Sequence, residues 1–244
     1  MADYDGTNAT DLIEGSDEAD VISGGNGGDE IYGRKGKDKI DGGNGKDEIR
    51  GNWGADEIHG GNGKDLLLGG RHADEIYGNN GSDEINGGLG KDSLYGGRGD
   101  DLIMGGRGDD QIDGGKGDDV IYSGLGEDML SGGKGSDLFV FDEVDDTEPV
   151  NVDLGDLGAG GLAAYLAYLA SLDEGVIQTK TITDFTSDAD SGDKLDVSSL
   201  YDGFDDVMWE YSEDAGGVLM QLDVDEYVLL TGVMELVETD FLFI

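Results

Sequence analysis

A nine-residue repeat governs more than half of this 244-residue sequence. From Gly6 to Val140 the chain divides into fifteen consecutive nonapeptides without insertion or deletion, from "GTNATDLIE" to "GGKGSDLFV". We number the positions of each repeat as places 1 to 9. Place 6 is aspartate in every repeat, place 8 is always Ile, Leu or Phe, and place 1 is glycine except at Ser123. A short repeat of constant period predicts a solenoid of stacked coils.

Two simpler interpretations of the repeats fail. A disordered linker needs only a Gly-rich, acidic composition, and such a linker has no reason to place a large apolar residue two positions after an aspartate in every repeat. The Gly-Lys pairs at 45–46, 63–64 and 90–91 resemble part of a phosphate-binding loop, but each is followed by Asp where that motif needs Ser or Thr. The strict phase therefore indicates a folded repeat.

The order of residue types within the nonapeptide predicts a six-residue turn followed by a three-residue strand. Glycines at places 1, 2 and 4 allow positive φ and let peptide carbonyls point inward. Alternation along the strand sends place 8 to one side and places 7 and 9 to the other, so we expect place 8 in the core and places 7 and 9 in water. Two nonapeptides make one coil, and stacking at about 4.8 Å brings the place-6 aspartates of alternate repeats side by side.

The charge of the chain restricts its partners. With 57 acidic and 15 basic residues the net charge is −42, and there is no cysteine. Nucleic acid and anionic membranes are therefore poor partners, no apolar run approaches the roughly 20 residues of a membrane span, and thiolate metal sites are excluded. Rows of carboxylates beside carbonyl oxygens are hard ligands that suit Ca²⁺ better than Mg²⁺ or Zn²⁺. The start "MADYDGTNAT" has no signal-peptide pattern.

Over residues 6 to 140 the pattern G-G-x-G-x-D-x-U-x resembles the RTX calcium-binding nonapeptide repeats. This resemblance implies an all-β fold in which residues 1–140 form a right-handed parallel β-roll. It also implies that Ca²⁺ ions, up to about 13 in the roll, are held between turns n and n+2 by place-6 aspartates and by carbonyls near places 2 and 4. It further implies export of the unfolded chain by a type I secretion transporter that reads an uncleaved C-terminal signal, and hence an extracellular location.

The metal ligands that the resemblance implies are side chains at place 6 and glycines at place 4. The aspartates are Asp11, Asp20, Asp29, Asp38, Asp47, Asp56, Asp65, Asp74, Asp83, Asp92, Asp101, Asp110, Asp119, Asp128 and Asp137. The glycines are Gly27, Gly36, Gly45, Gly54, Gly63, Gly81, Gly90, Gly99, Gly108, Gly117, Gly126 and Gly135. Three repeats depart at place 4, with Ala9, Glu18 and His72, and we interpret His72 as a turn residue and not as a ligand.

Residues 141–244 lack the repeat. We expect them to form a C-terminal capping and secretion-signal domain with antiparallel strands and one short helix. The apolar stretch "GLAAYLAYLASL" at 161–172 predicts the helix, which we interpret as a cover for the open end of the roll, with a partner-binding helix as the alternative. The region "VMWEYSEDAGGVLMQLDVDEYVLLTGV" alternates and predicts antiparallel strands joined through Gly216-Gly217. The segment "TITDFTSDADSGDKLDVSSL" resembles the one after the repeats in RTX proteases, lipases and alginate epimerases, and "DFLFI" resembles the C-terminal export signals of that family.

For function, the sequence favours calcium binding over catalysis. It contains neither H-E-x-x-H nor G-x-S-x-G, so we expect no enzyme. The leading hypothesis is a secreted calcium-binding protein that folds on Ca²⁺ outside the cell in a structural or surface-associated role. Because Met1 lies shortly before the first repeat, we expect it to be complete. The alternatives are a C-terminal secretion and folding module of a larger RTX enzyme or adhesin, and a surface or ice binder. A cell-surface or polysaccharide contact stays open.

Overall fold

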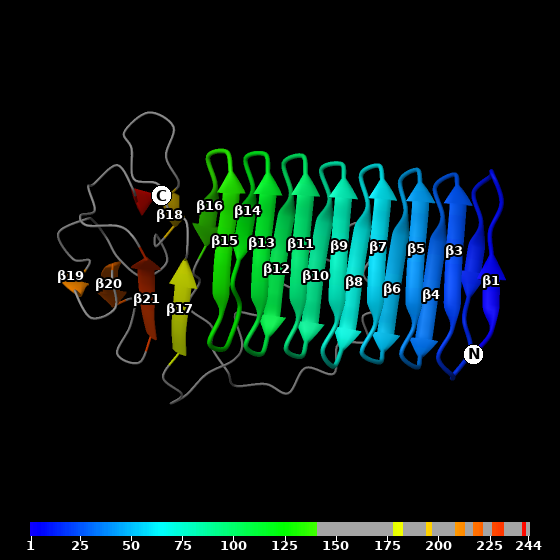
Figure 1. Ribbon diagram of the computed structural model, residues 1–244, viewed down its shortest axis with the longest axis horizontal. Helices are drawn as coiled ribbons and strands as arrows, with labels where there is room; N and C mark the ends of the chain where they lie inside the picture. The colour runs from blue at the N-terminus through cyan, green and yellow to red at the C-terminus, as the bar shows by residue number, and fades with distance from the viewer. Residues whose placement is uncertain are drawn as a thin grey trace.

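The computed structural model describes residues 1–140 and, after them, the strand residues 178–182, 194–196, 208–212, 217–221, 226–231 and 241–242. Successive strands of residues 1–140 alternate between two sheets, so that the chain winds as a stack of flattened coils from the N-terminal end onward (Figure 1). Each strand pairs in parallel with the strand 18 residues later, as in Val21↔Lys39 and Ile22↔Ile40. Two nonapeptides therefore make one coil, and the predicted all-β parallel β-roll is confirmed.

Two sheets contain all the described strands. The first sheet has 12 strands in the order β1 (Asp3–Asp5), β3 (Val21–Asn26), β5 (Lys39–Asn44), β7 (Glu57–Asn62), β9 (Glu75–Asn80), β11 (Ser93–Arg98), β13 (Gln111–Lys116), β15 (Met129–Lys134), β17 (Gln178–Ile182), β21 (Glu226–Thr231), β20 (Gly217–Gln221) and β19 (Met208–Ser212). The second has 10 strands in the order β2 (Leu12–Glu14), β4 (Glu30–Lys35), β6 (Glu48–Trp53), β8 (Leu66–Arg71), β10 (Glu84–Leu89), β12 (Leu102–Arg107), β14 (Val120–Tyr122), β16 (Leu138–Val140), β18 (Lys194–Asp196) and β22 (Phe241–Leu242).

The strands are longer than the sequence pattern predicts. Most of those from β3 to β15 have six residues and run from place 7 through place 3 of the next repeat, so the expected six-residue turn shrinks to places 4 to 6. The glycines at places 1 and 2 bend the chain without breaking the ladder, because Gly25 still pairs with Gly43 and Asn26 with Asn44. The prediction of a three-residue strand was therefore wrong for these strands.

The core is a single column of apolar side chains for each sheet. Every place-8 side chain from Ile22 to Phe139 is at most 1% exposed. Only Ile13, at the N-terminal edge, is less deeply covered. Removing each of these side chains from water contributes roughly 2 kcal/mol, and the prediction that place 8 builds the core is confirmed.

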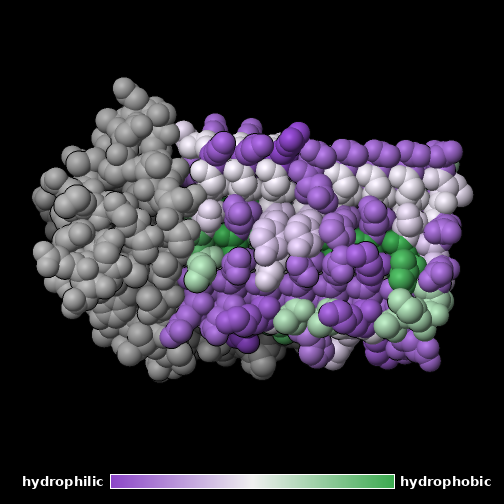
Figure 2. All heavy atoms as spheres, in the orientation of Figure 1, coloured by the Kyte–Doolittle hydropathy of each residue, from purple (hydrophilic) through white to green (hydrophobic). Residues whose placement is uncertain are grey.

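The two outer faces differ. The face of the roll seen in Figure 2 is mostly hydrophilic. On the second sheet, however, the place-9 side chains that we expected to meet water are buried in five cases: Arg50, Leu68, Asn86, Met104 and Val140. That expectation was therefore wrong for this sheet. Three of the five, Leu68, Met104 and Val140, are apolar and gain from burial, whereas the first sheet carries Ser, Asp, His and Tyr at the same place.

Both sheets continue past residue 140. Strand β17 pairs in parallel with β15, and β18 pairs in parallel with β16. Strands β19, β20 and β21 form an antiparallel set, which confirms the antiparallel strands predicted for this region. The predicted helix at 161–172 lies outside the described residues, and the domain boundary at 140 stays a prediction. Within the described part of the chain, no helix has the length and hydropathy to cross a membrane.

Candidate metal sites

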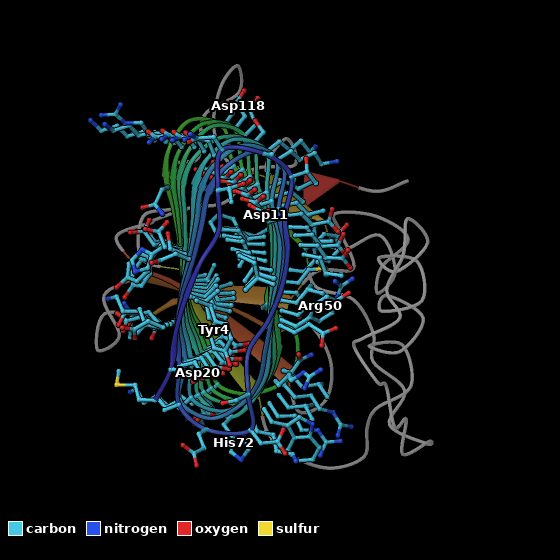
Figure 3. All side chains as sticks on the ribbon, turned by 90° about the vertical axis from the view of Figure 1, so that its right-hand side faces the viewer. Tyr4, Asp11, Asp20, Arg50, His72 and Asp118 are labelled. Atoms are coloured by element: carbon cyan, nitrogen blue, oxygen red, sulfur yellow. The ribbon has the colours of Figure 1, made fainter. Side chains whose placement is uncertain are left out.

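The place-6 aspartates lie inside the two ends of the coils. From Asp20 to Asp137 each is 1–2% exposed, and Asp11 at the edge is half-buried. Viewed along the roll, Asp11 and Asp20 lie at opposite ends of the flattened coil, and one row of aspartates extends behind each (Figure 3). The structure thus gathers the predicted side-chain ligands into two buried acidic rows.

One carboxylate oxygen of each aspartate from Asp29 onward holds neighbouring coils in register. The amide of Asp29 donates to Asp47 Oδ1 at 2.8 Å, and the amide of Asp47 donates to Asp65 Oδ1 at 2.8 Å. The same bond recurs between consecutive place-6 residues of each row, as far as Asp119 to Asp137 at 2.9 Å. Because the bond fixes Oδ1, it also fixes the direction of Oδ2.

The other oxygen, Oδ2, is buried without a hydrogen-bond partner in most of these turns. This holds for Asp29, Asp38, Asp47, Asp56, Asp65, Asp74, Asp83, Asp92, Asp101 and Asp119. Beside Asp47, a methyl group built on Gly42 would lie 2.7 Å from Asp47 Oδ2 and 2.7 Å from the carbonyl oxygen of Gly60. Oxygen atoms therefore converge at place 1, which explains the glycine there, because a side chain would collide with them.

Burial of these carboxylates perturbs their titration. Burial raises the pKa of Asp74 to about 9, and the negative charges of Asp92 and Asp56 add to the shift. Burial also raises the pKa of several others to about 7, namely Asp38, Asp65, Asp92 and Asp101. For Asp56, Asp83 and Asp119 burial raises the pKa to about 6. The folded rows therefore disfavour negative charge on these carboxyl groups unless a cation compensates it.

The first two turns behave differently. The amide and the hydroxyl of Thr7 donate to Asp11 Oδ2 at 2.6 and 2.8 Å, and the same groups of Ser16 donate to Asp20 Oδ2 at 2.7 and 2.8 Å. Burial pushes the pKa of Asp20 upward, but hydrogen bonds from Ser16 and Ala2 outweigh it and leave this pKa below its ordinary value. The sequence carries this signal as hydroxyl residues at place 2, which are not part of the glycine and aspartate pattern of the repeat.

The place-5 aspartates point outward, as Asp118 shows in Figure 3. Asp100, Asp109 and Asp118 are exposed, whereas their place-6 neighbours are buried. Two of them link successive coils, because Asp100 Oδ1 accepts the amide of Asp118 at 3.0 Å and Asp118 Oδ1 accepts the amide of Ser136 at 2.9 Å. The sequence pattern did not predict this second, exposed ladder.

The donor set fits a hard cation of high coordination number. Among the described residues, no group of three or more His, Asp or Glu side chains is placed to hold a metal ion. A cation in these turns would therefore need backbone carbonyls beside the place-6 carboxylates, which is an all-oxygen set of the kind that Ca²⁺ prefers. The exposed His72 ring contacts the carbonyl of Arg71 at 2.8 Å.

Comparison with known proteins bears on this interpretation. The family model of the RTX calcium-binding nonapeptide repeat (4 copies) matches residues 5–40, 32–67, 68–103, 77–112, 95–130 and 104–139. No curated protein matches the chain.

One solved structure that is similar to the chain is titled "Solution Structure of AlgE6R3 subunit from the Azotobacter vinelandii Mannuronan C5-epimerase". It is 21% identical, with 78% of this chain and 80% of that chain covered and a TM-score of 0.29. The fold assignment rests on the parallel ladder itself, and the family rests on the repeats, whose model matches more than half of the chain. This chain belongs to the family of RTX calcium-binding nonapeptide repeat proteins.

Proposed function

We propose that this chain is a secreted calcium-binding RTX module with a structural or surface-associated role, and that its roll folds when Ca²⁺ occupies the acidic turns. The observation that carries the proposal is the buried, unpaired Oδ2 repeated along both rows, as in Asp65 and Asp74. Leaving a buried carboxylate oxygen without a partner is costly, and successive carboxylates within each row repel one another. A divalent cation removes both costs at once.

The residues that would hold the ions are the place-6 aspartates together with backbone carbonyls, including those of the place-4 glycines from Gly27 to Gly135. All of these glycines except Gly90 have a positive φ, such as 130° at Gly27 and 151° at Gly63. A bound Ca²⁺ would supply positive charge and additional bonds to oxygen in each turn. The binding free energy then becomes folding free energy, because the unfolded chain cannot present this ligand set.

The proposal includes the location of the protein. Extracellular calcium modules bind at about 10⁻⁴–10⁻³ M, far weaker than cytosolic calcium buffers. Sites of that strength fill only outside the cell, so a chain of this kind would pass a type I transporter unfolded and fold after export. The acidic, apolar end "DFLFI" supports this route by its similarity to the export signals of the family.

Circular dichroism during a Ca²⁺ titration tests the proposal. We expect a chain that is largely disordered in excess chelator at neutral pH and becomes β-rich as Ca²⁺ is added. Mg²⁺ at the same concentrations serves as the control and should be much less effective, because it demands a rigid octahedral site. Full β structure in excess chelator at neutral pH would overturn the proposal.

A further inference from the structure

The backbone of the first two turns differs from that of all later turns in the described roll. At place 2, every residue from Gly25 to Gly133 has a positive φ, between 72° and 114°. Thr7 and Ser16, at the same place in the first two repeats, do not. Since φ is the rotation about the N–Cα bond, it decides where the place-2 amide points. In the first two turns that amide donates to the place-6 Oδ2.

The difference does not come from the mere absence of glycine. Arg34, Asn52 and Asn79 also occupy place 2, and they keep positive φ values of 77°, 72° and 72°. The place-6 residues of those three repeats, Asp38, Asp56 and Asp83, have an unpaired Oδ2 like that of glycine-containing repeats. Only the two repeats with a hydroxyl at place 2 show the other conformation. Thr7 in particular is β-branched and strongly disfavours positive φ.

The side-chain hydroxyl of Thr7 or Ser16 is the second donor to the place-6 carboxylate. Thr7 Oγ1 accepts the amide of Ala9 at 3.1 Å, and Ser16 Oγ accepts the amide of Glu18 at 3.1 Å. Each hydroxyl in turn lies 2.8 Å from the carboxylate Oδ2, which in Ser16 is closer than the 3.3 Å to the carbonyl oxygen of Glu18, so the hydroxyl donates to the carboxylate. Each Oδ2 therefore receives two donors from its own turn, an amide and a hydroxyl, whereas Oδ2 has no hydrogen-bond partner in the turns of Asp29 to Asp101 and of Asp119.

We propose that Thr7 and Ser16 take the place of a metal ion in the first two turns, so that Asp11 and Asp20 are not calcium ligands and the calcium-binding rows begin at Asp29 and Asp38. The proposal rests on the function proposed above and revises its ligand set. Hydrogen bonds to a charged acceptor are stronger than those between neutral groups, and a cation at the same oxygen would have to displace both donors. The N-terminal edge of the roll thus closes without metal.

Counting bound ions by equilibrium dialysis tests the proposal on the full chain. The double variant Asp11→Asn/Asp20→Asn should bind as many Ca²⁺ ions as the parent. The matched double variant Asp65→Asn/Asp74→Asn removes the same two charges from the middle of the two rows and should bind fewer. An equal loss of ions in both double variants would overturn the proposal. A parent chain that binds no Ca²⁺ would instead refute the proposed function, so the two failures are distinguishable.

A gain-of-site variant provides the converse measurement. Thr7→Gly/Ala9→Gly/Ser16→Gly/Glu18→Gly gives both turns the glycine pattern of the later repeats and should bind more ions than the parent. Thr7→Ser/Ser16→Thr keeps both hydroxyls and should match the parent. If the four-glycine variant binds no more ions than the parent, the role assigned to Thr7 and Ser16 is wrong. This holds even if the N-terminal turns of the variant are disordered without metal, because calcium should order turns of that sequence.

Discussion

Neighbouring aspartates of one turn are separated in the structure by what surrounds them. Asp101 is 2% exposed and has an unpaired Oδ2, while Asp100 is exposed and accepts one amide from the next coil. The direction of the chain through places 5 and 6 is therefore sufficient to give two identical side chains different environments. A charge at place 6 is desolvated and depends on a counter-charge, whereas a charge at place 5 is solvated.

Exchanging one carboxylate for an amide at each place should reveal this difference. Asp101→Asn removes a buried charge and should raise the calcium midpoint of folding about tenfold, on the scale of one hydrogen bond to a charged group. Asp100→Asn keeps an oxygen that can accept the Asp118 amide, so its midpoint should stay close to that of the parent. The same order is expected for Asp110 against Asp109 and for Asp119 against Asp118. Equal shifts within each pair in a calcium titration would show that the assignment of places is wrong.

At the scale of the element, the turn is held by close contact between successive coils. A methyl group built on Gly45 would lie 1.3 Å from the carbonyl oxygen of Gly27, and Gly45 has a φ of 148°. An alanine there must separate the coils or change the turn. On exposed edges, side chains reinforce the stack, because Asn62 donates to Asn44 at 2.8 Å and Asn80 donates to Asn62 at 3.0 Å.

Gly45→Ala should therefore destabilise the calcium-loaded roll by about 2 kcal/mol or more, the range of strained-backbone substitutions. Lys46→Ala, in the next position of the same turn, removes only an exposed side chain and should change stability little. Thermal unfolding at saturating Ca²⁺ measures both. If Gly45→Ala unfolds at the temperature of Lys46→Ala, the close approach of the coils at place 4 is not the constraint on this residue.

The sequence predicted those elements whose cause is local. The place-8 column from Ile22 to Phe139 follows from alternation within one repeat, and the parallel ladder follows from a constant period. The extension of strands through places 1 to 3 depends on pairing with a coil 18 residues away, so the nonapeptide alone does not show it. The burial of Leu68 and Met104 on an outer face also depends on the whole fold. The hydroxyl residue Thr7 is visible in the sequence, but only a comparison of φ between turns shows that its amide and hydroxyl bind the Asp11 carboxylate.

For the whole molecule, folding and protonation are linked through the acidic rows. The net charge is −42, and the roll concentrates carboxylates in two buried rows, within each of which neighbouring aspartates such as Asp56, Asp74 and Asp92 oppose one another's ionisation. Calcium and protons therefore compete for the same groups. Either of them removes the unfavourable negative charge, and protons do so less completely as the pH rises through the raised pKa values of about 7 and 9.

The pH dependence follows from the raised pKa values. Unfolded aspartates titrate near pH 3.9, whereas burial raises the pKa of Asp38 and Asp65 to about 7 and that of Asp74 to about 9 in the fold. The folded chain thus binds more protons than the unfolded chain between these values, so the stability that these groups contribute to the calcium-free roll is fully present at and below about pH 4 and falls as the pH rises from about 4 to 9.

In chelator, circular dichroism should show more β structure at pH 4 to 5 than at pH 8. In the presence of calcium, the midpoint of the titration should move to higher Ca²⁺ concentration as the pH is lowered from 8 to 5, because each ion must displace protons from the rows.

An aspartate whose Oδ2 accepts a hydroxyl serves as the internal control. Asp20, whose pKa lies below the ordinary value, favours its charged form in the fold, so Asp20→Asn should leave this pH dependence unchanged. Asp74→Asn removes the carboxyl with the most raised pKa and should weaken it. A calcium midpoint that does not change between pH 5 and 8 would contradict the burial of ionised carboxylates as the reason that this chain needs a metal.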